Sequence, residues 1–227
     1  MRTRRDLHTT LDTIQLKWGS GALHPIGDLP RPACLPTGIP ALDAAVGGGF
    51  PRSRLTELAG APTSGVTTLA LQALAQQASD LAVYIDPPRT FDPEYAAGCG
   101  VQVEALLLAR PQGWPEALDI LFDTVVSGLP GVVIVNARAA SPSAHNQLNT
   151  VLGRLQAGLT RTACVLLALT APDTNLSAPA ALRLLLERER WLVEGRAVRG
   201  VQTRATTLRP AGRAPVSVEI AFGEGRG

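Results

Sequence analysis

Residues Gly60 to Thr67 come close to forming a phosphate-binding loop. Their sequence, GAPTSGVT, fits the pattern G-x-x-x-x-G-K-[ST] except that Val66 stands where the lysine belongs. In such a loop the glycines let backbone N–H groups point inward, and the N-terminus of the next helix favours an anion. The spacing therefore predicts a vestigial nucleotide site. Its predicted residues in this segment are Gly60, Ser64, Gly65, Val66, Thr67 and Thr68.

Valine at position 66 removes a charge on which phosphate chemistry depends. A lysine there would donate charge-assisted hydrogen bonds to the outer phosphates, each worth about 1.5–3 kcal/mol. Lys17 is the only lysine in the chain and lies far from the loop in sequence, which leaves Arg52, Arg54 or Arg89 as cations that could approach it. We expect weak ATP binding at most, through the backbone, and no efficient phosphoryl transfer. The chain is therefore predicted not to be an enzyme.

A second part of the same chemistry is altered at Asn136. The apolar run Val132 to Val135 predicts a buried strand, and an aspartate at the end of such a strand would bind Mg²⁺. Asparagine is neutral and a poorer ligand for this cation. Cys34, Cys99 and Cys164 lack metal-ligand spacing and are expected to be buried, reduced thiols. We predict no metal site and no required cofactor.

Apolar segments around the loop alternate in a way that predicts an α/β fold. Leu55 to Leu58 predicts a strand before the loop, and Thr67 to Gln77 predicts a helix after it. Apolar strands separated by helices indicate a mostly parallel sheet with helices on both faces. Arg199–Leu208 and Val216–Phe222 alternate like antiparallel edge strands at the C-terminus. The remaining predicted elements are strands 81–85, 131–135 and 163–169 and helices 115–127 and 147–159.

Residues 1–34 are predicted to form an N-terminal helical arm and linker, and residues 35–227 to form the core. Leu7, Leu11, Ile14 and Trp18 recur at helical spacing, and a proline-rich stretch follows them. Such an arm either docks on a neighbouring subunit or packs against its own domain. The sequence leaves both alternatives open.

Charge is nearly balanced over the 227 residues, with a formal net charge of +2, but it is unevenly distributed. From residue 161 onward ten arginines outnumber six acidic residues, which suggests a surface for a polyanion such as DNA. The alternative is that arginine simply replaces lysine throughout. No apolar run reaches the roughly 20 residues of a membrane span, and no secretory signal is visible, so a cytoplasmic location is expected. The candidate DNA contacts are Arg196, Arg199, Arg204, Arg209 and Arg213.

The chain resembles the RecA recombinase family over most of its length. The segments that carry the resemblance are Leu35–Asp43, Gly47–Glu57, Ile85–Asp86, Phe91–Ala96, Thr203–Arg204 and Phe222–Gly225. The resemblance implies a RecA-like core and an arm that joins subunits. Asp92 and Tyr95 match residues that contact adenine in this family, so they complete the predicted nucleotide site. The alternative is that Asp92 caps a helix and Tyr95 packs inside the protein.

The departures from the family pattern fall on its catalytic parts. Pro88 lies in the stretch where the family has its catalytic glutamate, and Thr170 begins the stretch that should carry the phosphate-sensing glutamine. The two DNA-binding loops are shortened, to about residues 139–147 and 171–181. Together with the substitutions in the loop and at the strand end, these changes suggest that ATPase chemistry has been lost.

A RecA-like chain with these changes is similar to the ImuA group of accessory proteins. The resemblance implies a non-catalytic adaptor in DNA repair, acting in translesion synthesis during the SOS response to DNA damage. Its implied partners are a Y-family polymerase-like protein and an error-prone polymerase, with RecA itself as a further partner. One alternative is a DNA-binding recombination mediator that acts with RecA. Another is a nucleotide-binding switch.

Overall fold

The computed structural model describes residues 4–19, 33–77, 81–174, 176, 180–209 and 215–223. The chain divides into two units, residues 1–32 and 33–227. Helix α1 (Arg4–Trp18) belongs to the first unit, in the segment where the apolar spacing predicts a helix. The predicted boundary at residue 34 and the docking of this arm both stay predictions.

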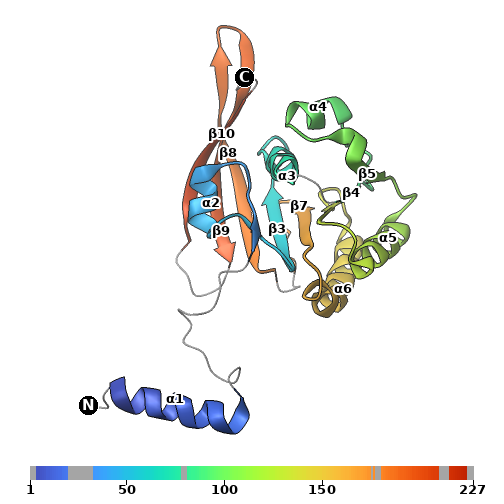
Figure 1. The fold of residues 1–227 in the computed structure, drawn as a ribbon. Coiled ribbons are helices and arrows are strands. Elements are labelled where there is room, and N and C mark those ends of the chain that lie inside the picture. Colours follow the sequence, from blue (N-terminus) through green and yellow to red (C-terminus); the bar gives the residue numbers. More distant parts are fainter. Residues whose placement is uncertain are drawn as a thin grey trace. The chain divides into compact units, whose positions relative to one another are not determined.

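An eight-stranded sheet forms the centre of the second unit (Figure 1). Its strand order is β10-β9-β8-β3-β7-β6-β4-β5. The strands from β8 to β5 run parallel, whereas β9 and β10 are antiparallel, which confirms the predicted fold class. The strands are β3 (Arg54–Gly60), β4 (Ala82–Ile85), β5 (Leu106–Ala109), β6 (Val132–Asn136), β7 (Val165–Thr170), β8 (Leu182–Glu194), β9 (Ala197–Arg209) and β10 (Ser217–Gly223).

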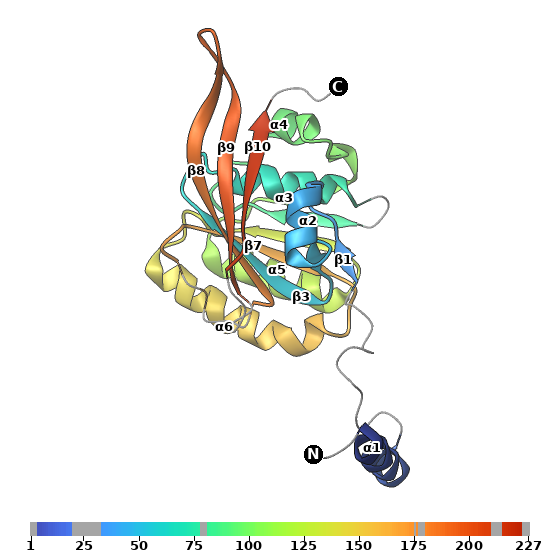
Figure 2. The ribbon, with the colours of Figure 1, turned by 90° about the vertical axis from the view of Figure 1, so that its left-hand side faces the viewer.

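Helices cover both faces of this sheet (Figure 2). On one face lie α2 (Pro40–Val46), α3 (Val66–Ala75) and α4 (Pro93–Gly98), and on the other lie α5 (Trp114–Ser127) and α6 (Pro142–Leu159). Successive residues of a strand point to opposite faces, so the apolar strands supply both layers. In β7, Leu167 packs in the first layer and Leu166 in the second.

Short elements complete the second unit. β1 (Cys34–Leu35) pairs antiparallel with β2 (Phe50–Pro51), and a 3₁₀ turn η2 covers Val103–Ala105. Within the described residues, no helix is both long enough and apolar enough to cross a membrane.

Helix α6 begins five residues earlier than the sequence pattern predicts, at Pro142 rather than Gln147. The hydroxyl oxygen of Ser141 accepts a hydrogen bond from the backbone N–H of Ala144, and proline suits the first helical position. The first shortened loop, predicted at residues 139–147, therefore ends at residue 141. Part of the second, 171–181, lies outside the described residues.

Candidate functional site

The phosphate-loop sequence connects the C-terminal end of β3 to the start of α3. Gly65 is the N-cap of α3 and has a φ angle of 89°, in the left-handed region that favours glycine. A Cβ at Gly65 would lie 2.3 Å from the ring of Phe222, and one at Gly60 would lie 2.3 Å from Ser64 Oγ. Close packing therefore requires both glycines, whereas phosphate binding by the loop stays a prediction.

Ser64 is the best-buried polar residue of the loop, with 1% of its surface exposed. Its carbonyl oxygen accepts a hydrogen bond from Thr203 Oγ1 at 3.0 Å. Its own hydroxyl has no hydrogen-bond partner among the described residues. A buried hydroxyl without a partner costs free energy, so this group is available to an acceptor or donor that enters the loop.

Val66 lies in the hydrophobic layer formed by α2, α3, α4 and the sheet, and its side chain is 1% exposed. It therefore contributes apolar packing to the core at the position where the motif has a charge.

A charge reaches the loop from another strand. Arg138 follows the end of β6, and its Nη1 donates a hydrogen bond to Thr67 Oγ1 at 3.3 Å. Its Nε is buried and has no partner among the described residues. Burial lowers the pKa of Arg138, and a Coulombic interaction with Tyr84 opposes this shift. Because a guanidinium does not lose its proton in proteins, a cation lies beside the last residue of the loop.

The arginines suggested by the sequence lie elsewhere. Arg52 donates to the carbonyl oxygen of Ala163 at 3.1 Å, and Arg54 donates to that of Ser53 at 3.0 Å. Arg52 precedes β3 and Arg54 begins it, so both lie at the end of the strand opposite the loop. Arg89 is exposed on the segment after β4.

A second arginine contacts the tip of the loop. Arg188 on β8 donates from Nη1 to Thr63 Oγ1, and its Cζ lies 4.5 Å from the centroid of the Trp191 ring. This cation–π contact holds the side chain over the aromatic face. Arg138 and Arg188 thus approach the loop from β6 and β8, and the sequence analysis predicted neither contact.

Asn136 is part of a buried polar network. Its Nδ2 donates to Thr90 Oγ1 at 3.0 Å and to Asp86 Oδ1 at 3.4 Å, while its Oδ1 accepts from the backbone N–H of Arg138 at 3.4 Å. Asp86 is fully buried, and its Oδ2 accepts from the backbone N–H of Phe91 at 2.8 Å. Mg²⁺ prefers several oxygen ligands in octahedral geometry. These residues do not fit it, because the amide and the carboxylate are engaged and the Thr67 hydroxyl contacts a guanidinium.

A pocket of about 550 Å³ opens beside the loop. Tyr95 contributes to its wall, and the Tyr95 hydroxyl lies 2.6 Å from Thr68 Oγ1. Aromatic side chains and a few polar groups suit a nucleotide base, so the pocket and loop together fit a nucleotide. The lining residues are Thr63, Gly65, Thr68, Gln72, Glu94, Tyr95, Gly98, Cys99, Trp191, Val198, Arg199, Gly200, Val201, Phe222 and Gly223.

Of the two predicted adenine contacts, Tyr95 lines this pocket and Asp92 does not. Asp92 caps α4, because its Oδ1 accepts from the backbone N–H groups of Glu94 and Tyr95. Tyr95 does not pack inside the protein, since 48% of its surface is exposed. Burial raises the pKa of Tyr95, so its hydroxyl stays protonated at neutral pH. Adenine binding by both residues stays a prediction.

Pro88 and Thr170 lie in the stretches where the family has its catalytic glutamate and its phosphate-sensing glutamine. Pro88 is half-buried after β4. Thr170 is buried, and its hydroxyl donates to Glu57 Oε1 at 3.0 Å. Glu57 Oε2 also forms a buried ion pair with Arg183 Nε at 3.1 Å. Thr170 therefore supports a structural contact between β7, β3 and β8.

Four of the candidate DNA contacts, Arg196, Arg199, Arg204 and Arg209, belong to the β8–β9 hairpin, whose tip extends beyond the other strands (Figure 1). Arg196 is exposed at the turn. Arg199 pairs with Glu194 at 3.1 Å, and Arg204 pairs with Glu189. Arg209 ends β9, and its side chain lies outside the described residues, as does Arg213.

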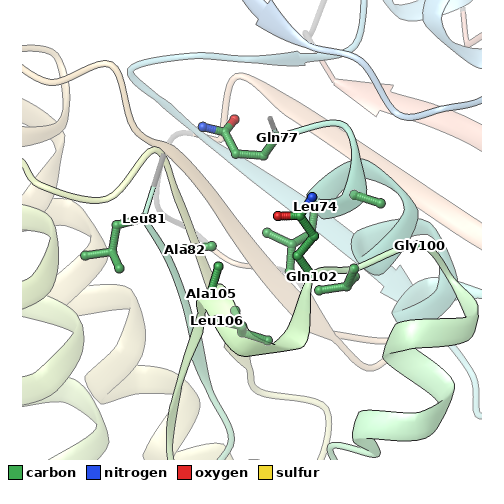
Figure 3. A pocket seen from close by; sticks show the side chains of 10 residues that line it. Leu74, Gln77, Leu81, Ala82, Gly100, Gln102, Ala105 and Leu106 are labelled. Atoms are coloured by element: carbon green, nitrogen blue, oxygen red, sulfur yellow. The ribbon is translucent and has the colours of Figure 1, made fainter. Parts of the chain in front are cut away.

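A further cavity of about 590 Å³ lies away from the loop, between the end of α3 and the starts of β4 and β5 (Figure 3). Its lining consists of apolar side chains, a glycine and the amides of Gln77 and Gln102. Such a lining offers hydrogen bonds but no charge, so this cavity is a weaker candidate for phosphate chemistry.

Comparisons with known proteins show which family the sequence is similar to. A family model described as the RecA N-terminal domain matches residues 5–168. Protein RecA of Picosynechococcus sp. is 38% identical over 158 residues, covering 67% of this chain and 45% of that protein. Protein RecA of Aquifex aeolicus is 36% identical over 160 residues, covering 68% of this chain and 46% of that protein. Protein RecA of Chlorobaculum parvum is 28% identical over 261 positions, covering 97% of this chain and 75% of that protein. The chain spans less than half the length of the first two relatives.

The prediction that the chain is not an enzyme is wrong in the light of these comparisons. The relatives carry the name of RecA, an ATP-dependent recombinase, so the comparisons give no support to a non-enzyme. The prediction rested on the changes at Val66, Asn136, Pro88 and Thr170 together, with arginines near β3 and β4 as the replacements considered for the lysine. It did not consider Arg138, which reaches Thr67 across the sheet.

Proposed function

Because the chain belongs to the RecA family, we propose that it is a nucleotide-binding protein of DNA-damage tolerance, of the ImuA type. The observation that carries the proposal is the pocket of about 550 Å³ beside the phosphate loop. The loop offers backbone N–H groups to phosphate, and Tyr95, Trp191 and Phe222 offer aromatic surface to a base.

Titration calorimetry with ATP on the full chain tests nucleotide binding. Replacing Tyr95 by alanine removes one wall of the pocket and the hydrogen bond to Thr68. Loss of one stacking surface is expected to weaken ATP binding by about 1–3 kcal/mol. Val126→Ala, at an exposed position of α5 on the other face of the sheet, is the control. A wild-type chain that binds no ATP contradicts this part of the proposal.

The proposed setting is translesion synthesis in the cytoplasm, with a Y-family polymerase-like protein, an error-prone polymerase and RecA as partners. Family membership supports this setting. Affinity purification of the full chain from DNA-damaged cells is expected to recover at least one of the three. Recovery of none of them, from cells in which the tagged chain is folded and abundant, counts against it.

Self-association through α1 belongs to the same proposal. Leu11 and Ile14 are half-buried on one side of this helix, which offers a small apolar strip to a second copy. Leu11→Asp is expected to lower the molar mass measured by light scattering, whereas Asp12→Ala on the exposed side is the control. Equal masses for all three proteins would argue against the arm as a contact.

DNA binding is the second candidate, and the β8–β9 hairpin favours it. Residues 187–204 carry five arginines and three glutamates, and most of these side chains are exposed. The carboxylates that pair with Arg199 and Arg204 reduce the net attraction. If the hairpin binds DNA, the affinity for single strands falls steeply as salt rises, and Arg196→Ala weakens it. Salt-independent or undetectable binding excludes this function.

A further inference from the structure

The position of the Arg138 guanidinium suggests which cation serves the nucleotide site. In a phosphate loop, the lysine reaches the outer phosphates and the Ser/Thr hydroxyl binds Mg²⁺. Here the corresponding hydroxyl, Thr67 Oγ1, accepts a hydrogen bond from Arg138 Nη1 at 3.3 Å. One side chain therefore lies next to the place of the divalent cation and brings a positive charge to a loop that has valine in place of lysine.

Two polar groups at this site lack partners among the described residues. They are the buried Nε of Arg138 and the hydroxyl of Ser64, a residue with 1% of its surface exposed. A phosphate group accepts hydrogen bonds through several oxygens and pairs well with the planar guanidinium. A phosphate bound in the loop is an acceptor of the kind that such buried donors lack.

The surrounding groups are unsuited to a magnesium ion. Asn136 is neutral, and both ends of its amide are used by Asp86, Thr90 and the Arg138 backbone. The Asp86 carboxylate accepts hydrogen bonds inside the protein. A divalent cation would also lie close to a guanidinium of the same sign, which is unfavourable.

We infer that Arg138 takes the place of both the lysine and the magnesium ion, so that nucleotide phosphates bind in this loop without Mg²⁺. The inference rests on the proposed nucleotide binding and goes further, because it names the group that recognises phosphate and the cation that the site does without. Arg138 acts here as a phosphate-binding residue supplied by the segment after β6 rather than by the loop itself.

The test is titration calorimetry of the full chain with ATP and with adenosine, each in excess EDTA and in excess MgCl₂. The wild-type chain is expected to bind ATP with affinities that agree within about twofold in the two buffers. Arg138→Ala is expected to weaken ATP binding by about tenfold or more, the effect of losing a charge-assisted hydrogen bond, while adenosine binding is unchanged. Arg161→Ala, an exposed arginine before the start of β7 at the other end of the sheet, is expected to behave as wild type.

The outcomes separate the inference from the proposed function. If ATP binds the wild-type chain only with Mg²⁺, or binds folded Arg138→Ala as tightly as wild type, the inference is overturned and nucleotide binding stands. If the wild-type chain binds ATP in neither buffer, both are overturned. If circular dichroism shows that the alanine variant does not fold, Arg138→Gln replaces it, because glutamine lacks the charge but keeps a polar side chain. The same loss of ATP affinity is then expected.

Discussion

The Thr203 hydroxyl donates a hydrogen bond to the Ser64 carbonyl oxygen over 3.0 Å, so β9 fastens the phosphate loop to the antiparallel side of the sheet. Both residues are buried, with exposed fractions of 0% and 1%. The loop is thus held by a strand that comes late in the chain, as well as by β3 and α3 on either side of it.

Replacing Thr203 by valine keeps the shape of the side chain and removes the donor. The Ser64 carbonyl oxygen is then left without this bond in a buried position, which is expected to lower the free energy of unfolding by about 1–3 kcal/mol. Urea unfolding measures the change. Thr206→Val on the same strand is the control, because its hydroxyl contacts Ser217 at an exposed site and its loss is expected to matter less. Equal effects of the two variants would show that the loop contact is not stabilising.

Replacing Gly65 by alanine places a Cβ 2.3 Å from the Phe222 ring and imposes a φ of 89° on a residue that disfavours it. The left-handed backbone alone costs about 1–2 kcal/mol, and moving Phe222 adds to this cost. We expect a lower melting temperature and weaker ATP binding, because Phe222 lines the pocket. Gly153→Ala in α6 has open space around its Cβ, and there the expected effect is a gain of about 0.5–1 kcal/mol. A Gly65→Ala protein as stable as wild type would contradict the close contact.

Glu57 and Arg183 form a buried ion pair whose side chains are 0% and 12% exposed. Glu57→Leu leaves a buried arginine without this partner and is expected to destabilise the fold by about 3–5 kcal/mol. Glu57→Leu combined with Arg183→Met replaces both charges and is expected to recover most of that loss. A double-mutant cycle by urea unfolding measures the coupling. The exposed pair Arg199–Glu194 serves as reference, with an expected coupling below about 1 kcal/mol. Additive effects at the buried pair would rule out the coupling.

The buried thiol of Cys164 is expected to make the free energy of unfolding depend on pH in the alkaline range. Burial raises the pKa of its thiol from 9.0 to about 12, so the folded protein resists deprotonation while the unfolded chain does not. The stabilisation is complete below about pH 9 and is lost as pH rises towards 12, by at most about 1.4 kcal/mol per pH unit. The Cys164→Ala variant has no thiol at this position, so it does not lose stability in this way as pH rises. Its deficit in unfolding free energy at neutral pH is therefore expected to shrink towards about pH 11. A constant difference from wild type across this range would contradict the raised pKa.

The three cysteines, all within the described residues, form no disulfide. The expectation of buried thiols is confirmed for Cys164, whereas Cys34 and Cys99 are half-buried. Cys164 directly precedes β7, an interior strand of the sheet, which explains this difference.

The parts of the fold that could be predicted are those with a strong local pattern. β4, β6 and β7 are almost wholly apolar runs, and β3 carries apolar residues around the buried Thr56 and Glu57, since each strand is buried between two helical layers. β5 and β8 were not predicted. β5 is a short edge strand in which Leu107 is 54% exposed, and the outer half of β8 is charged because it extends past the sheet as a hairpin.

The candidate site likewise divides into residues that a local motif predicts and residues that only the fold brings together. The strand–loop–helix order around the loop follows from a local motif, and close packing explains Gly60 and Gly65. The contacts of Arg138 and Arg188 join segments separated by 71 and 125 positions, and only the parallel order of β8, β3, β7 and β6 brings them together. A hint for Arg138 was available, because it follows a strand whose C-terminal end lies at the same edge as the loop.

Trp191 gives this site an optical reporter. The chain has three tryptophans, of which Trp18 lies in α1 and Trp114 begins α5 on the other face of the sheet. Trp191 lines the pocket, is 44% exposed and stacks with Arg188. A molecule that enters the pocket must change the polarity around this indole, so its emission shifts while that of Trp114 does not. In a chain with phenylalanine at positions 18 and 114, fluorescence would follow occupancy of the pocket in real time, without a labelled ligand.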